Sequence, residues 1–193
     1  MIPNLKPWVA AWRRVYTVTL DSPQREVVLP FDFAEQTTYR LLGLIASTGA
    51  VTFPSLVAND DISAAYSVRA VSMVDGSPSY NHQAPATARC AQIGPGFPGN
   101  GDISASEQVI LDTLVTKTAA GFFAASNPFT NGSGAGDLHF INSKWNSAAE
   151  ITKLAVRADV DVNGVWGTSF FSPFAVGSRF DLFVLNNAEV WTG

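Results

Sequence analysis

The clearest metal-binding spacing in the sequence lies close to its C-terminal end. Asp159, Asp161 and Asn163 alternate along the chain, and Gly164 follows them. Oxygen ligands at alternate positions with a glycine for the sharp turn form the first half of a calcium-binding loop. A complete loop of this kind has Glu at its twelfth position, where this chain has Phe170. We therefore predict a hairpin turn here, and a calcium site would need ligands from elsewhere in the chain.

Residues suited to nucleophilic catalysis are few and lie apart. The chain has two histidines, His82 and His139, in different segments, and one cysteine, Cys90. Nucleophilic catalysis needs a base beside the nucleophile. His139 lies in an alternating run and is predicted to be structural, whereas His82 lies in a polar run where contact with a ligand is the alternative. A single cysteine excludes an internal disulfide and a cysteine-based zinc site, and we expect a buried Cys90.

Other catalytic signatures are incomplete. Asp60 and Asp61 are adjacent, but carboxylate chemistry depends on separation in space, so the sequence nominates no pair. Glycines 94, 96 and 99 match a dinucleotide-binding pattern, yet prolines stand at positions 95 and 98 and no helix follows promptly. Such a site needs helix amides at the pyrophosphate. We predict a protein that is not an enzyme and takes no cofactor.

Composition favours a protein that associates with neighbours. Of 193 residues, 47% are hydrophobic and 15% are charged, against about 25% charged in ordinary soluble domains. A chain so poor in charge is expected to hide part of its surface against other subunits. The net charge is −4 and the basic residues are scattered, which argues against a nucleic-acid partner. No apolar run has the length of a secretory signal or membrane span, so we expect synthesis in a cytoplasm without membrane insertion.

The elements that must position any site are short strands between turns. Runs rich in Val, Ile, Thr, Phe and Tyr are separated by Gly, Pro, Asn and Asp, which predicts about eight to ten strands in an all-β sandwich or jelly roll. We expect an N-terminal arm over residues 1–13 and one domain over residues 14–193. The predicted strands cover residues 14–20, 26–31, 39–45, 51–57, 64–74, 86–93, 109–118, 121–124, 138–142, 151–160, 165–171 and 179–185.

Residues 77–85, 94–101 and 127–136 are predicted to be loops, because Gly, Pro and polar residues crowd them. One segment stays ambiguous. Ser147 and Glu150 match a capping box, and the apolar residues after them keep helical spacing. The same segment is rich in strand formers, so we favour a strand over residues 148–158 and keep a helix as the alternative.

The aromatic residues are the strongest candidates for binding. The chain has thirteen Phe, five Trp and four Tyr, and several lie in or beside predicted loops, where rings can stack on sugars or anchor a protein. Packing at the ends of the sandwich is the alternative. Two tryptophans precede the first strand in a proline-interrupted arm that should pack against its own domain or a neighbouring subunit. The candidates are Tyr80, His82, Phe129, Trp145 and Trp166 for ligand contact, and Trp8 and Trp12 for assembly.

The C-terminal pattern resembles a known family. The sequence ITKLAVR at residues 151–157, followed by FAVGSRFDLFVL at 174–185, is similar to the closing strands of small jelly-roll proteins of tailed bacteriophages. YRLLGLI at residues 39–45 resembles their early central strand. The resemblance covers about two thirds of the chain loosely, and residues 75–147 depart from it.

This resemblance implies a structural protein of the virion that commonly forms trimers with itself and contacts other virion proteins. The first expectation is a tail-tip or tail-fibre protein that contributes to attachment to a host receptor, which a glycan would fit. A capsid decoration protein is the second expectation. A carbohydrate-binding module or carbohydrate-active enzyme is the third.

Overall fold

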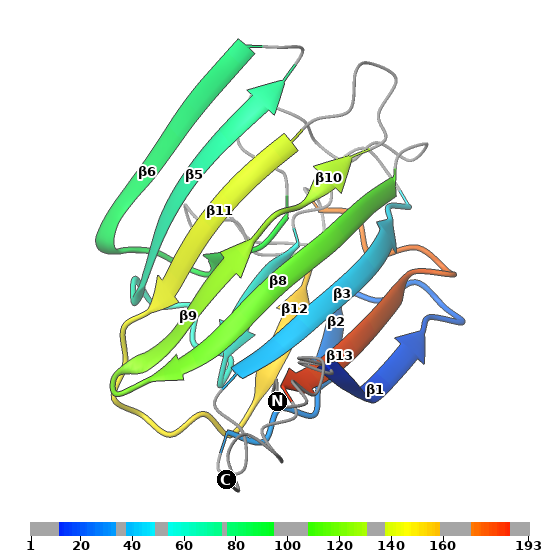
Figure 1. Cartoon of the computed structure of the whole chain (residues 1–193), viewed down its shortest axis with the longest axis horizontal. Coiled ribbons are helices and arrows are strands. Elements are labelled where there is room, and N and C mark those ends of the chain that lie inside the picture. Colours follow the sequence, from blue (N-terminus) through cyan, green and yellow to red (C-terminus); the bar gives the residue numbers. More distant parts are fainter. Residues whose placement is uncertain are drawn as a thin grey trace, which may run out of the picture.

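The chain folds into two antiparallel β-sheets. The computed structural model describes residues 12–33, 38–48, 54–74, 77–94, 108–130, 138–158 and 171–185. Within these ranges there are thirteen strands and no helix. Figure 1 looks onto the larger sheet, with β2 and β12 of the smaller sheet behind it. The predicted all-β sandwich is confirmed.

The large sheet has nine strands. β9 (Gly121–Ser126) pairs with β8 and β11 outside the main path. The order along the main path is β1 (Trp12–Thr19), β13 (Arg179–Leu185), β3 (Thr38–Ala46), β8 (Gln108–Thr118), β10 (Phe129–Thr130), β11 (Leu138–Trp145), β5 (Tyr66–Val74) and β6 (Ser77–Ala88). The small sheet has the order β2 (Glu26–Leu29), β12 (Leu154–Arg157), β4 (Ser55–Ala58) and β7 (Ala91–Gln92).

Eight of these strands form a jelly roll. They are the four strands of the small sheet and the run β1-β13-β3-β8 of the large sheet. In Figure 1, β2 and β12 of the small sheet lie behind the part of the large sheet that contains β13, β3 and β8, while β7 contacts β11 and β5. Numbered among themselves in chain order, the eight strands run 1-8-3-6 in one sheet and 2-7-4-5 in the other, which is the connectivity of a jelly roll. The other five strands come from two insertions, β5–β6 between β4 and β7 and β9–β11 between β8 and β12. Both insertions widen the large sheet on the side of β8.

Alternation along the strands fills the space between the sheets. In β3 and β8, Leu41, Ile45, Leu111 and Val115 are fully buried, while the alternate residues, among them Leu44, Ile110 and Leu114, lie on the opposite side of the sheet. Successive side chains of a strand face opposite sides of the sheet. Removing these side chains from water stabilises the fold by roughly 1.5–3 kcal/mol each. Cys90, with no exposed surface, is buried as predicted.

Hydroxyl groups of the large sheet hold the edge strand β7 of the small sheet. Ser143 Oγ donates to the carbonyl oxygen of Gln92 at 2.9 Å, and Ser126 Oγ donates to that of Ile93 at 2.5 Å. A serine hydroxyl has one proton, so Thr113 Oγ1 must donate to Ser126 Oγ, 2.7 Å away. These bonds satisfy carbonyl groups that an apolar interior would leave without a partner.

The largest error in the predicted elements is at residues 77–85. The sequence predicts a loop there, but these residues begin the twelve-residue strand β6. β6 is at the edge of the large sheet. Proline has no N–H to donate to a neighbouring strand, and Pro78 and Pro85 are tolerated at this edge for that reason. The predicted strand over residues 86–93 is divided at Arg89 and Cys90, where the chain crosses from β6 to β7 in the other sheet.

Smaller differences concern strand ends. The predicted strand 51–57 begins at Ser55 within the described residues, and β10 occupies part of the predicted loop 127–136. Residues 154–157 form the favoured strand, and Ser147 Oγ accepts from the amide of Ala149 in a turn instead of capping a helix. β1 begins at Trp12, so two residues assigned to the arm belong to the sheet. Residues 95–101 and 165–170 lie outside the described ranges.

Two glycines with positive φ offer a matched test of the fold. Gly121 (φ 93°) starts β9, and a Cβ there would lie 2.0 Å from the carbonyl oxygen of Trp145. A Cβ added to Gly177 (φ 84°) would meet no other atom within 4 Å. We expect Gly177→Ala to lower the free energy of unfolding by about 1–2 kcal/mol through backbone strain alone. Gly121→Ala should cost at least about 2 kcal/mol more because of the clash.

Urea denaturation of the two variants, at one protein concentration, measures this difference. Equal losses of unfolding free energy in the two variants would contradict the close approach of Gly121 to the backbone of Trp145.

Candidate functional site

The outer face of the large sheet carries more large apolar side chains than such a face usually does. An antiparallel sheet with one solvated side normally presents polar residues there. Here seven outward side chains are apolar and 39–53% exposed. We call them the apolar face: Leu44, Met73, Ile110, Leu114, Phe123, Phe129 and Phe140.

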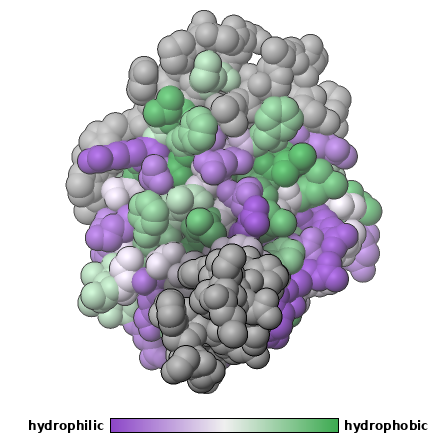
Figure 2. All heavy atoms as spheres, viewed as in Figure 1, coloured by the Kyte–Doolittle hydropathy of each residue, from purple (hydrophilic) through white to green (hydrophobic). Residues whose placement is uncertain are grey.

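The strand register places four of these residues, on β3, β8, β10 and β5, in one row across the sheet. Leu44 lies opposite Ile110, and Ile110 lies opposite Phe129. The row continues through the backbone of Leu138 to Met73. Residues directly opposite on one face are in contact distance, so one apolar row crosses β3, β8, β10, β11 and β5. Figure 2 shows hydrophobic residues spread across the middle of this face, between hydrophilic ones.

Beside the apolar face, on β3 and β8, the charges of Arg40 and Asp112 are paired. Arg40 Nε and its terminal nitrogen donate to the two carboxylate oxygens of Asp112 at 2.8 and 2.6 Å. This hydrogen bonding raises the pKa of Arg40. The Arg40 and Asp112 side chains are 35% and 38% exposed. Solvent screening therefore limits the contribution of this ion pair to stability to about 0.2–1 kcal/mol. The pair lies between Leu42 and Leu114 in the register and adds no net charge to the surface.

A second ion cluster lies beside the apolar face on β13. Asp181 accepts from Arg179 at 2.8 Å and lies 3.6 Å from Arg14 on β1. Burial alone would raise the pKa of Asp181, but the hydrogen bond from Arg179, with further contributions from Thr17 and Arg14, lowers it overall. Arg13 and Arg14 on β1 are exposed.

The predicted binding residues do not form one site. Phe129 belongs to the apolar face, and the β6 backbone places Tyr80 opposite Val71 and His82 opposite Arg69. Trp145 is 1% exposed, and its indole Nε1 donates to Asp61 at 2.8 Å. The prediction that its ring faces a ligand is therefore wrong, because position 145 continues the inward alternation of β11. His139, also 1% exposed, is structural as predicted. Trp12 lies on β1; Trp8, Trp166 and the segment with Asp159, Asp161 and Asn163 lie outside the described residues.

A strained turn after β4 is a feature that the sequence did not reveal. Asn59 and Asp60 have φ values of 52° and 56°, which are rare for residues other than glycine. Asp61 N donates to Ala58 O at 2.7 Å, and two consecutive positive φ values fit a type I′ turn. Asn59 Oδ1 accepts from the amides of Thr152 and Lys153 at 2.9 and 3.1 Å. This turn is where the chain leaves the small sheet for the first insertion.

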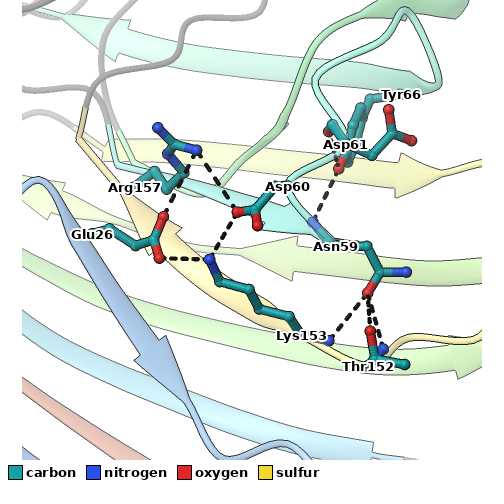
Figure 3. Close-up of polar contacts among 9 residues, drawn as sticks. Glu26, Asn59, Asp60, Asp61, Tyr66, Thr152, Lys153 and Arg157 are labelled. Atoms are coloured by element: carbon teal, nitrogen blue, oxygen red, sulfur yellow. Dashed lines mark hydrogen bonds and ion pairs between the residues drawn. The ribbon is translucent and has the colours of Figure 1, made fainter.

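Charged side chains around this turn compensate one another (Figure 3). Lys153 Nζ lies 2.7 Å from Glu26 and 2.8 Å from Asp60, and Arg157 is within 4.0 Å of both carboxylates. Hydrogen bonding to Asp60 and Glu26 raises the pKa of Lys153. A lysine held in its charged form is not a nucleophile. We interpret these four residues as a clamp that fixes the turn to β2 and β12.

Two further kinds of site, a metal-binding cluster and a membrane-spanning helix, are not found in the described part of the chain. It contains no group of three or more His, Cys, Asp or Glu side chains that would hold a metal ion. Nor do these residues include a helix long and apolar enough to cross a membrane.

Asp61 gives the turn a measurable pH dependence. Burial raises its pKa, but hydrogen bonds from Ser63 and Trp145 outweigh this effect and lower it overall. Its stabilising effect is therefore complete above the unfolded pKa of about 3.9 and is lost as the pH falls through the lower folded value. We expect Asp61→Asn to be less stable than wild type at neutral pH, by a margin that shrinks between about pH 5 and pH 2.

Urea denaturation at several pH values measures this margin. Asp21→Asn, which removes the same charge from an exposed turn, is the control for net charge. A margin that stays constant with pH would contradict the role of the Asp61 carboxylate.

Comparison with known proteins adds no relative. No family model, no curated protein and no solved structure matches this chain.

Proposed function

We propose that this protein is a non-enzymatic structural subunit of a tailed-bacteriophage virion, at the tail tip or tail fibre, and that the apolar face is the surface that attaches it within the particle. The observation that carries the proposal is the set of seven exposed apolar side chains on six strands of the large sheet. A continuous apolar patch is the usual mark of a protein–protein contact.

The architecture supports this proposal. Jelly rolls build viral capsid and lectin domains among others, although a fold alone does not decide function. Four of the seven residues of the apolar face, Met73, Phe123, Phe129 and Phe140, lie on strands that the two insertions add to the jelly roll. An elaboration that exposes apolar surface destabilises a free subunit in water unless a neighbour covers it. The additions are therefore best explained by assembly.

Attachment to a host receptor needs residues outside the apolar face, because that face is assigned to contacts within the particle. Phe129 is 43% exposed but belongs to the apolar face. The buried Trp145 has no role in glycan binding in this proposal. Tyr80 and His82 remain candidates on the edge strand β6.

A position on the capsid surface is the second candidate. It is favoured by one observation: the apolar residues lie on a sheet face instead of at loop tips. A sheet face suits a protein that lies flat on a lattice, and a loop tip suits one that reaches a receptor.

Electron microscopy of purified particles labelled with an antibody to this chain tests the proposal. We expect label at the tip of the tail or its fibres. Label spread over the shell would support decoration of the capsid and overturn the tail assignment. Particles that contain none of this chain would overturn both.

A host-binding assay tests the receptor role separately. Purified protein should bind host cells, and Tyr80→Ser should reduce binding severalfold because it removes an aromatic ring from the edge strand β6. Val176→Ser, which removes an apolar side chain of 58% exposure outside the strands, is the control. Equal binding by all three proteins would contradict a receptor contact at Tyr80.

A further inference from the structure

We infer that a second copy of this chain covers the apolar face, with the two faces packed against each other around a twofold axis near β8. This inference rests on the proposed function in one respect, because both assign the apolar face to assembly. It adds that the partner is a second copy of this chain. A twofold contact places the same surface on both subunits. The face must therefore be complementary to itself in shape, polarity and charge.

The charge pattern meets this requirement. The charged pair beside the apolar row, Arg40 and Asp112, is neutralised within one subunit at 2.6 Å. An unpaired charge at this place would repel the same charge of a second copy, whereas this pair does not. A strongly charged partner would find no unpaired charge in this pair to match.

The polar residues around the centre fit the border of an interface. Arg69 is exposed on β5, and Lys144 is partly exposed on β11. Both lie in the rows of the register beyond Phe140, away from Ile110. Interfaces are apolar at the centre and polar at the rim. At the rim these cations stay hydrated and do not oppose association of two copies.

The size of the apolar face is also sufficient. With roughly 200 Å² of surface per large apolar side chain, the exposed fractions of 39–53% leave on the order of 600 Å² of apolar surface on the seven residues. A standard interface buries about 800 Å² on each partner, and about 57% of that is apolar. About 450 Å² of apolar surface per copy therefore satisfies a stable contact, and this face exceeds it.

Sedimentation velocity of the purified chain from about 1 to 100 μM tests the inference. We expect wild type to dimerise. Ile110→Glu, which places like charges opposite each other across the axis, and Phe140→Glu, which puts a charge into the apolar contact, should each weaken dimerisation at least roughly tenfold. Val28→Glu and Val176→Glu change residues that are 50% and 58% exposed outside the large sheet, and should leave the dimer intact. Thermal unfolding confirms that each variant is folded.

Cysteine cross-linking locates the axis. The single native cysteine, Cys90, is buried, so an introduced surface cysteine is the reactive one. Ile110→Cys should form a disulfide-linked dimer on mild oxidation, and Val176→Cys should not. Cross-linking by both variants to the same extent would overturn the face-to-face arrangement.

The outcomes for dimerisation and for the proposed function are distinguishable. A wild-type chain that stays monomeric over the whole concentration range overturns the inference, wherever the chain lies in a particle. A trimer that depends on Ile110 overturns the twofold arrangement. A twofold dimer from a chain that no particle contains supports the inference and overturns the virion proposal.

Discussion

The structure depends on one constraint: in strands β3, β5, β8, β11 and β13, every second side chain belongs to the interior between the two sheets. In β8 this fixes Val109, Leu111 and Val115 as core and leaves Ile110 and Leu114 outside. A shift of one residue in register would exchange the two sets. The alternation therefore defines the apolar face at the same time as the core. The same constraint brings Ser126 and Ser143 inward, where their hydroxyls satisfy the carbonyl groups of β7.

Much of the fold follows from the sequence because this alternation is local. The strand at residues 179–185 has the bounds expected for it, and β3 differs from expectation by one residue at each end. Prediction of strands and loops fails where the position of a residue in the folded sheet decides which structure that residue allows. Prolines indicate a loop over residues 77–85, but at a sheet edge they are tolerated in a strand. The crossing at Arg89 and Cys90 depends on which sheet each half joins, and no local pattern states that.

The candidate site is less predictable than the fold. The inward position of Trp145 was available from the alternation of His139, Ile141 and Ser143, had the strand been extended by three residues. The apolar face was not available, because β3 and β8 are apolar on both sides and a sequence does not say which side a second sheet covers. The strained turn at Asn59 and Asp60 depends on contacts with Thr152 and Lys153, more than ninety residues away.

The free edges of the sheets have a consequence for the size of any assembly. β1 carries an irregularity in register between Arg14 and Tyr16, and β6 contains two prolines; the edges of the small sheet are strands of four and two residues. Unpaired strands are templates for endless lateral growth unless they are short, kinked or poor in amide donors. These edges therefore resist fibre formation. An assembly of this chain is therefore expected to grow through sheet faces and to stop at a finite number of copies.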